Sequence, residues 1–183
     1  MGLRLKIAME ELILIKPTAE YGTQIMEYRQ EFLDAGDSMD GCGPLRRLDN
    51  PTEYLKVCAD YENSKTVPVD KVQATQFFCI RKSDNKLVGM IQVRHHFNEY
   101  LEKYAGHIGY SVRPTERRKG YAKEMLKMAL PFCKEIGLDK VLISCSDGNI
   151  GSEKTILANG GVYESTVLEP NDNKNLKRYW IVL

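Results

Sequence analysis

Three adjacent cations followed by a glycine form the part of the sequence best suited to chemistry. Arg117, Arg118 and Lys119 stand directly before Gly120, where a strand pattern passes through a basic turn into a helix pattern. Loop amides and the positive end of a helix dipole favour an anion, and glycine lets a phosphate approach closely because it has no Cβ. The stretch therefore predicts a phosphate-binding turn, although three cations in a row can also be no more than a solvated loop.

Local patterns define the elements on either side of this turn. Residues 107–112 are mostly β-branched, aromatic or apolar and predict a strand that ends near Arg113, because Pro114 has no amide hydrogen for a ladder. Apolar residues recur at helical spacing after the turn and predict a helix that runs to Ile136. Pro131 lies inside that pattern, so we expect a bend there or an early end of the helix.

The rest of the chain predicts an α+β fold. We expect further strands at residues 11–18, 74–81, 87–97, 140–146, 162–167 and 177–183, helices at 18–35, 50–63 and 150–158, and a connection at 98–105. A tight turn at 83–85 joins two of these strands into a hairpin, with Gly89 as a candidate bulge. Strand 140–146 should lie parallel to strand 107–112 through a right-handed crossover. The result is a mixed, mostly antiparallel sheet of about six to seven strands flanked by about four helices.

Composition limits the classes of partner. The 183 residues are 43% hydrophobic and 28% charged, which suits one globular domain over residues 1–183. The formal charge of +1 argues against nucleic acid or an anionic membrane as a partner, and no stretch has the roughly 18 apolar residues that a membrane span needs. Five cysteines without a C-x-x-C pair indicate a reduced, cytoplasmic protein. His95 and His96 point to opposite faces of a strand and have no third ligand nearby, so we expect no metal.

Two motifs carry a family resemblance. Arg117-x-x-Gly120-x-Ala122 stands after a strand and opens a helix, while Asn149-x-x-Ser152 follows the next strand and precedes the run ILANGGVYE. In these motifs and in the order of its elements, the sequence resembles the GNAT superfamily of N-acetyltransferases over nearly its whole length. Within that superfamily it is similar to a subfamily of uncharacterised predicted acetyltransferases, and the resemblance implies a GNAT-like central sheet.

The resemblance implies acetyl-coenzyme A as co-substrate. In the family two neighbouring strands splay apart beyond a bulge, here near Ser111 and Ser144, and the thioester lies in the cleft between them. Turn amides would hold the pyrophosphate, the strand edge would hold the pantetheine, and Asn149 would bind its cysteamine arm. The cofactor-binding residues implied in this way are Ser111, Val112, Arg113, Arg117, Arg118, Lys119, Gly120, Tyr121, Ala122, Asn149 and Ser152.

Acetyl transfer to an amine needs a deprotonated nucleophile, a donor to the developing oxyanion and a proton for the leaving thiolate. His107 is the candidate base because it begins the central strand and an unperturbed imidazole titrates near neutrality, although a structural histidine at the sheet end fits equally well. Many relatives carry a tyrosine where this chain has Leu157, so Tyr163, with Tyr110 as an alternative, is the candidate acid. The thiolate can also leave unaided. The Val112 amide can serve as the oxyanion donor.

The expected function is acetyl-coenzyme A-dependent N-acetylation of a primary amine by direct transfer. Cys145 has no basic neighbour, so a covalent acetyl-cysteine route is not expected. The acceptor would be a small molecule or a peptide, and its pocket should be built from the first two helices, the loop 36–50 and the connection 95–105. Tyr28, Arg29, Arg46 and Arg47 are candidates for its lining, whose charge would suit a carboxylate or phosphate. An acyl-coenzyme A-binding module without turnover is the alternative, and P-loop nucleotide binding is disfavoured because no G-K-[ST] follows the glycine. The sequence does not determine the oligomeric state and leaves a homodimer open.

Overall fold

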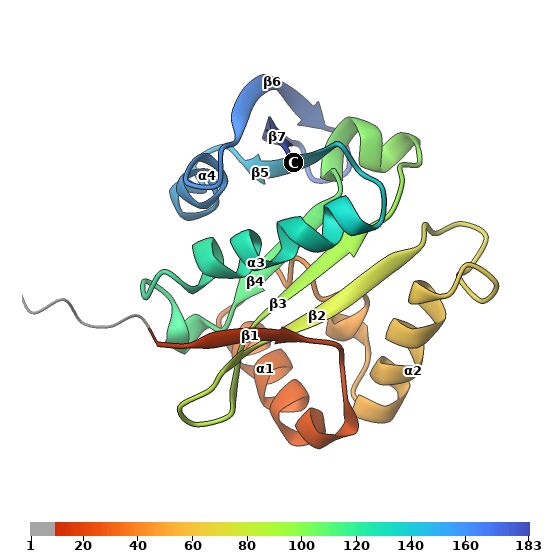
Figure 1. Cartoon of the computed structure of the whole chain (residues 1–183), viewed down its shortest axis with the longest axis vertical. Helices are drawn as coiled ribbons and strands as arrows, with labels where there is room; N and C mark the ends of the chain where they lie inside the picture. Colours follow the sequence, from red (N-terminus) through yellow and green to blue (C-terminus); the bar gives the residue numbers. More distant parts are fainter. Residues whose placement is uncertain (1–9) are drawn as a thin grey trace, which may run out of the picture.

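Two antiparallel sheets form the framework of this computed structural model, which describes residues 10–183 (Figure 1). The larger sheet has the order β1-β2-β3-β4, and its strands are Leu12–Ile15, Ala74–Arg81, Lys86–Arg94 and Ile108–Val112. The smaller sheet has the order β5-β7-β6, and its strands in chain order are Lys140–Ser146, Val162–Glu169 and Lys174–Val182. The α+β class and the expected number of strands are confirmed.

Four α-helices accompany these sheets within residues 10–183, and each corresponds to a helix that the sequence predicts. They are α1 (Gly22–Asp34), α2 (Pro51–Glu62), α3 (Tyr121–Glu135) and α4 (Ile150–Leu157). Asn50 caps α2 by accepting hydrogen bonds from the amides of Thr52 at 2.8 Å and Glu53 at 3.2 Å. Thr18 makes no such bond at the start of α1, because a 3-10 turn at Ala19–Tyr21 comes first.

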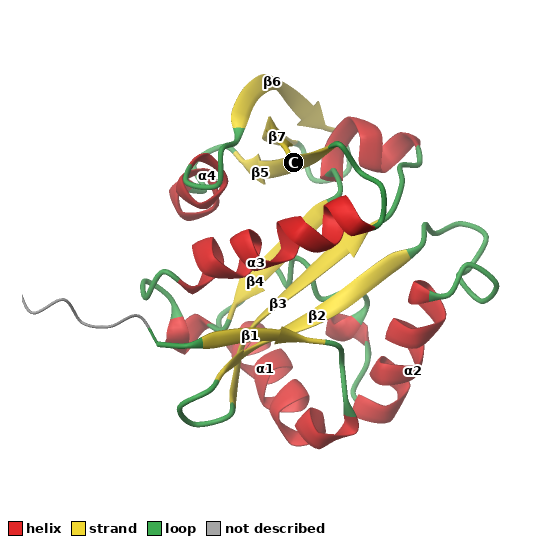
Figure 2. Ribbon diagram, viewed as in Figure 1, coloured by secondary structure: helices red, strands yellow, loops and turns green. Residues whose placement is uncertain are grey.

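Helices cover both faces of the larger sheet (Figure 2). On one face, aromatic residues such as Phe32 of α1 and Tyr54 of α2 share a buried cluster with Phe78 of β2. On the other face, Met125 of α3 belongs to a buried cluster with Ile91 of β3. Because both faces are covered, β2 and β3 are buried along nearly their whole length, and this apolar burial stabilises the sheet that carries β4.

The predicted parallel pairing of the two central strands is wrong. β4 and β5 belong to different sheets, and each ladder in the described part of the chain is antiparallel. The two strands are joined just before β4 begins, where the His107 amide donates to the Leu142 carbonyl at 2.7 Å and Gly106 bridges Ile143. β5 pairs on one side with the last strand, β7, and its other side forms no ladder with β4, so the two sheets remain separate.

The segment after β3 also differs from the expectation. β3 ends at Arg94 rather than at residue 97, and the connection contains a short π-helical segment, η3 (Leu101–Ala105). The side chain of Asn98 accepts a hydrogen bond from the Leu101 amide at 2.9 Å and so begins this segment. The sequence did not predict this segment, because the mixed polar stretch after Asn98 is too short to show a helical period.

Two irregularities lie where the sequence places them. Cys79 pairs with Gly89 and the register then shifts, so Val88 is the extra residue of a bulge, as expected at Gly89. Pro131 lies inside α3, but the helix does not end early and continues to Glu135. The proline is on the exposed side of the helix, where water can bind the carbonyl that it leaves without an amide partner.

Candidate active site

A cleft of about 720 Å³ opens between the two sheets where β4 and β5 part. Residues 108–112 form part of one wall and residues 144–146 form part of the other. Each of the two strands is the edge of its own sheet, so both offer unpaired backbone groups to the cleft. The splayed strands that the resemblance implies are therefore present, but the register of β4 on β3 contains no bulge, and the separation starts where His107 contacts Leu142.

The backbone of β4 presents alternate amides to this cleft. The Arg113 amide donates to the Val88 carbonyl at 2.9 Å, which fixes the odd-numbered residues as those that bond to β3. In an antiparallel ladder the residues between them direct N–H and C=O away from the partner strand. Tyr110 and Val112 therefore turn their amides to the open edge, where the Val112 amide suits the role of oxyanion donor.

The basic turn has the open form of an anion site. Arg118 and Gly120 both have left-handed backbone angles, with φ of 68° and 83°. Gly120 stands at the N-cap of α3, and no side chain caps the helix within the described residues. Apart from its chain neighbours, no described heavy atom lies within 4 Å of the place that a Cβ on Gly120 would occupy. The turn therefore fits a pyrophosphate, and a side chain at this position would project into that space.

A buried carboxylate holds the turn on the protein. Glu116 is 4% exposed and contacts Lys119 at 2.6 Å, Lys86 at 2.7 Å and Arg81 at 2.7 Å. Burial alone would raise the pKa of Glu116, but hydrogen bonds from these three cations outweigh it and lower the pKa to about 2. The Lys119 side chain is committed to Glu116 and does not line the cleft, although the sequence placed it there.

The two arginines of the turn have different environments. Arg117 pairs with Asp37 at 2.6 Å, donates through Nε to the Val112 carbonyl at 3.2 Å and lies over the Phe32 ring. These contacts tie the turn to the segment that follows α1. Arg118 is exposed and lines the cleft beside Gly120 and Ala122, so its guanidinium can reach a phosphate.

Arg113 lies away from the cleft, unlike its neighbours Ser111 and Val112, which line it. The Arg113 side chain is buried against α1, where it pairs with Glu31 at 3.3 Å and donates to the Gln24 carbonyl at 3.1 Å. Ser111 and Arg113 lie on the same face of β4, which is turned to α1: the Ser111 hydroxyl lies 3.0 Å from that of Tyr28, and the Arg113 guanidinium lies over the Tyr28 ring. The pantetheine contact implied by the resemblance therefore falls to Ser111 and Val112.

The start of α4 meets β4 at the cleft. The Asn149 side chain accepts a hydrogen bond from the Ser152 amide at 3.0 Å and so caps α4. The Ser152 hydroxyl lies 2.8 Å from the Tyr110 hydroxyl, and all three residues line the cleft. Burial raises the pKa of Tyr110, so the phenol stays protonated at neutral pH. The structure thus brings Asn149 and Ser152 together with a tyrosine that the sequence ranked only second.

His107 lies outside the lining of the cleft. It is 5% exposed, packs on Phe97 with ring centroids 3.9 Å apart, and accepts a hydrogen bond from the Leu142 amide through Nδ1 at 2.9 Å. Burial, with a smaller contribution from Arg94, lowers the pKa of His107 to about 4. The imidazole joins the two sheets at the closed end of the splay, an arrangement that supports a structural role rather than that of a base.

Tyr163 also lies away from the cleft. It is 53% exposed on β6, and its hydroxyl is hydrogen-bonded to Thr166 at 2.9 Å. Cys145 does line the cleft, but burial raises its pKa to about 11, so the thiol stays protonated near neutrality. Neither position supports the corresponding role, a proton donor for Tyr163 or a nucleophile for Cys145.

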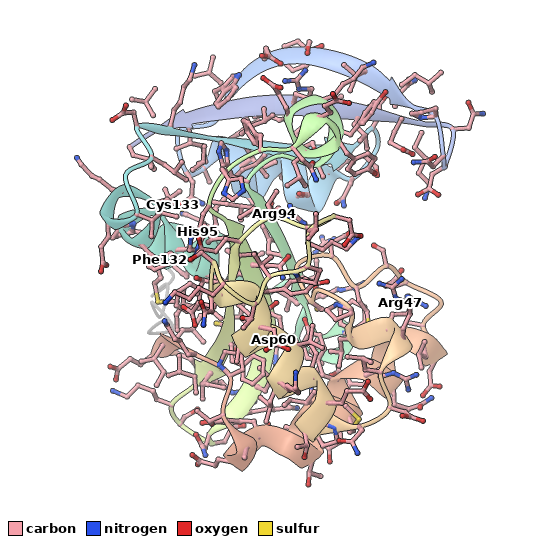
Figure 3. All side chains as sticks on the ribbon, turned by 90° about the vertical axis from the view of Figure 1, so that its right-hand side faces the viewer. Arg47, Asp60, Arg94, His95, Phe132 and Cys133 are labelled. Atoms are coloured by element: carbon pink, nitrogen blue, oxygen red, sulfur yellow. The ribbon has the colours of Figure 1, made fainter. Side chains whose placement is uncertain are left out.

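None of the four residues considered for the acceptor pocket lines the cleft. Tyr28 is fully buried under the sheet, and Arg29 donates to the Leu45 carbonyl at 3.2 Å. Arg46 donates to the Asp37 carbonyl, and Arg47 is exposed on the outer side of the molecule (Figure 3). These cations brace the loop between α1 and α2 or face solvent, so the sequence was wrong about their position.

Loops bring other polar residues to the cleft. Asp40 comes from the loop after α1, Arg94 and Tyr100 come from the end of β3 and the segment after it, and Glu169 comes from the β6–β7 hairpin. Glu169 is 4% exposed and accepts a hydrogen bond from the Asp172 amide at 2.8 Å. The sequence predicts the loop 36–50 and the connection 95–105 as parts of the acceptor pocket, and Asp40 and Tyr100 lie in these two segments. It did not single out Arg94 or Glu169, whose positions depend on how distant segments fold together.

The fold, the splayed strands and the uncapped turn before α3 define an acetyltransferase of the GNAT class. The model of the Acetyltransferase (GNAT) family matches residues 44–158, which is more than half of the chain. The chain therefore belongs to this family. Membership confirms the expected enzyme class, together with acetyl-coenzyme A as its co-substrate.

Several solved structures share the fold. RimJ from Mycobacterium smegmatis, in complex with CoA-disulfide, is 14% identical with a TM-score of 0.70 over 93% of this chain and 81% of that chain. The microcin C7 self-immunity acetyltransferase MccE, in complex with acetyl-CoA and AMP, is 17% identical with a TM-score of 0.67 over 94% and 93%. The dodecameric spermidine N-acetyltransferase from Vibrio cholerae is 14% identical with a TM-score of 0.64 over 93% of each chain. No curated protein sequence matches the chain.

Two kinds of feature are absent from the part of the chain that the structure describes. Between residues 10 and 183, no helix has both the length and the apolar character that crossing a membrane requires. In the same part of the chain, no three or more His, Cys, Asp or Glu residues gather in a group that could hold a metal ion.

Proposed function

We propose that this protein transfers the acetyl group of acetyl-coenzyme A directly to a primary amine in a ternary complex. The observation that carries the proposal is the cleft between β4 and β5, which reaches the uncapped N-terminus of α3. One continuous space can therefore hold a pyrophosphate at the helix and a pantetheine along the strand edge. Because β1 pairs with β2 and β7 pairs with β5, segments outside the family match complete both sheets, and we propose that the whole chain works as one domain.

Residues on both walls would hold the donor. The amides of residues 118–122 and the Arg118 side chain would bind the pyrophosphate, and the open edge at Ser111 and Val112 would bind the pantetheine. Asn149 and Ser152 flank the same space from the start of α4. Acetyl-coenzyme A, when bound, supplies an activated acetyl thioester. The protein's task is to orient that group and to meet the charges that develop on it.

Two groups in the cleft suit those charges. The Val112 amide faces the open edge and can donate to a developing oxyanion without rearranging. The Tyr110 hydroxyl, joined to Ser152 at 2.8 Å, can deliver a proton to the departing thiolate. We therefore assign the acid to the pair Tyr110 and Ser152 in place of Tyr163.

In this proposal, water removes the proton from the amine. Among the described residues that line the cleft there is no histidine. The Glu169 carboxylate lines it, but a hydrogen bond from the Asp172 amide is the main cause of its lowered pKa, which makes it a weak base. A lysine-like amine has a pKa near 10, so only a small fraction is neutral at pH 7. The rate should follow that fraction as pH rises.

Release of free thiol from acetyl-coenzyme A across a panel of primary amines tests the proposal. We expect thiol release that depends on an amine and a product that carries one acetyl group by mass spectrometry. The alternative is an acyl-coenzyme A-binding module without turnover, which is supported by Leu157, an exposed aliphatic residue where many relatives carry a tyrosine. Tight calorimetric binding of coenzyme A without thiol release on any amine would establish that alternative.

We also propose a cytoplasmic location and a homodimer. All five cysteines are free and buried, which suits a reducing compartment. The edge strand β6 exposes Val162, Tyr163 and Leu168, apolar surface of the kind that a second copy can cover. Sedimentation velocity should show a species of twice the chain mass, and a monomer at all concentrations would contradict the dimer.

A further inference from the structure

A second pocket, of about 310 Å³, adjoins the cleft. Arg94 and Tyr100 line both spaces, so the two share a wall. Tyr61, Val72 and Leu101 give the second pocket an apolar side. A ligand in this pocket would lie next to the cleft in which acetyl transfer is proposed, and its volume suits a small molecule rather than a folded partner.

Arg94 is a cation without an ion-pair partner among the described residues. Its Nη1 donates to the Gly106 carbonyl at 3.2 Å, and no carboxylate of residues 10–183 comes within 4.0 Å of its guanidinium. By contrast, Arg81, Arg113 and Arg178, whose side chains are 10%, 4% and 15% exposed, each pair with a carboxylate. Arg94 is partly buried, and a partly buried charge without a partner is costly. Proteins keep such groups where a ligand supplies the counter-charge.

Charged groups near Arg94 do not neutralise it. Burial lowers its pKa, and Asp40 and Tyr100 act in the opposite direction without forming an ion pair with it. A guanidinium stays protonated in proteins at neutral pH. Asp70 and Lys71, the other charged residues of the second pocket, pair with each other at 2.7 Å. Arg94 therefore gives this pocket its net positive charge.

The strand register places this cation beside the reaction site. The Arg94 amide donates to the His107 carbonyl at 2.8 Å, and Nη2 of its side chain would lie 3.4 Å from a Cβ built on Gly109. Gly109 directly precedes Tyr110, whose amide faces the cleft. Figure 3 shows Arg94 between the smaller sheet and the layer that contains α2. An anion bound by Nη2 would thus lie close to the open edge of β4.

We propose that the second pocket is the acceptor site and that Arg94 binds a carboxylate of the acceptor, which makes the acceptor a small amine of the amino-acid type. The inference rests on the proposed function and gives its substrate class. A guanidinium fork matches a carboxylate in geometry as well as in charge. The apolar side of the pocket at Tyr61, Val72 and Leu101 would receive the acceptor's side chain.

Matched ligands and matched variants test this inference. The ligands are the common L-amino acids, their carboxamides, and spermidine as an amine without a carboxylate. The variants are Arg94→Gln, Arg94→Lys and the control Arg47→Gln, because Arg47 lines neither pocket. Calorimetry on the complex with coenzyme A measures binding, and thiol release measures turnover.

We expect at least one amino acid to bind about tenfold or more tightly than its carboxamide, because the amide cannot form a charge-assisted pair. Arg94→Gln should raise the KM of that amino acid by about tenfold or more and change the KM of acetyl-coenzyme A by less than about twofold. The KM of Arg94→Lys for that amino acid should lie between those of the parent and Arg94→Gln, because lysine keeps the charge but not the two-pronged geometry of the guanidinium. Arg47→Gln should behave as the parent protein, and all variants should keep its thermal midpoint.

Equal use of an amino acid and its carboxamide, or a preference for spermidine, would overturn the inference and leave the acetyltransferase proposal standing. An Arg94→Gln variant with a lower thermal midpoint and equally raised KM values would assign Arg94 a structural role and also overturn it. Amino-acid binding that depends on Arg94 without any thiol release would support the pocket and contradict the proposed function. If no amino acid binds or reacts, the pocket assignment is wrong.

Discussion

The hydroxyl of Tyr110 lies 2.8 Å from Oγ of Ser152, and this contact joins the middle of β4 to the first turn of α4 at the cleft. Burial raises the pKa of the phenol, so it holds its proton at neutral pH. The pair stands among the residues that would surround the thioester. Tyr110 on β4 can therefore act as the proton donor, the role that many relatives give to a tyrosine at the position of Leu157 on α4.

Removing the Tyr110 hydroxyl should slow the chemical step. We expect Tyr110→Phe to lower kcat by about 10- to 100-fold, at the low end of general-acid effects because a thiolate is a good leaving group. Ser152→Ala should have a smaller effect of the same sign, and Tyr163→Phe should leave kcat unchanged. Steady-state thiol release at saturating substrates measures all three. A decrease in kcat in Tyr163→Phe as large as that in Tyr110→Phe would instead indicate that Tyr163 on β6 is the acid.

A carboxylate at the phosphate turn should abolish donor binding. Gly120→Glu places a negative side chain where the pyrophosphate would lie, so we expect coenzyme A affinity to fall by about 100-fold or more. Gly137→Glu is the matched control, because Gly137 has a φ of 89°, nothing within 4 Å of a built Cβ, and a place at the other end of α3. Calorimetry with coenzyme A should show parent-like affinity for the control. Unchanged affinity in Gly120→Glu would mean that the pyrophosphate lies elsewhere.

His107 should matter for stability and not for the pH dependence of turnover. Its folded pKa of about 4 lies below the ordinary 6.5, so it is neutral through the neutral range and cannot give an ionisation near pH 7. We expect kcat/KM to rise about tenfold per pH unit up to the pKa of the amine, in the parent protein and in His107→Ala alike. A profile that levels near pH 7 in the parent and changes shape in the variant would restore the base role.

The same substitution should cost about 2 to 4 kcal/mol of unfolding free energy, because it leaves the Leu142 amide unpaired and opens a cavity. Since the pKa of His107 is lowered on folding, its contribution to stability is complete above pH 6.5 and is lost as pH falls towards 4. Urea denaturation at pH values from 7.5 to 4 measures how the unfolding free energy depends on pH. This dependence should be weaker in His107→Ala than in the parent.

Glu116 should make the protein sensitive to stronger acid. Its folded pKa of about 2 lies below the ordinary 4.5, so its stabilisation is present above pH 4.5 and is lost as pH falls towards 2. Glu116→Gln should lower the unfolding free energy by about 3 to 5 kcal/mol at pH 7, because it leaves the buried Arg81 without that carboxylate. The variant's unfolding free energy should also depend less on pH below 4.5. Exposed Glu99→Gln is the control for urea denaturation at each pH. Equal stability of the two variants would contradict the anchoring role.

Local sequence determined the elements and the phosphate turn. Proline and glycine punctuation, helical spacing after Gly120 and the Asn50 cap act within a few residues, so α2, α3, β2 and β5 could be placed from the sequence with small errors. The turn belongs to this group because its anion site is made by backbone amides at a helix start, whatever the distant chain does. Asn149 and Ser152 were found through the family resemblance, and the structure shows them as a helix cap and its partner.

Only the tertiary structure decided which side chains face the cleft and which strands pair. The sequence cannot show that β5 pairs with β7 and forms no ladder with β4, so from the sequence alone the two central strands look like paired neighbours. Long-range packing turned His107 to Leu142, Lys119 to Glu116 and Arg113 to Glu31. Within residues 10–183 it left Arg94 without a carboxylate partner. Each of these outcomes is a competition among charges and hydrogen-bonding groups far apart in the chain. The sequence therefore determined where a phosphate can bind, and the folded arrangement decided which residues remain for the acceptor and the proton.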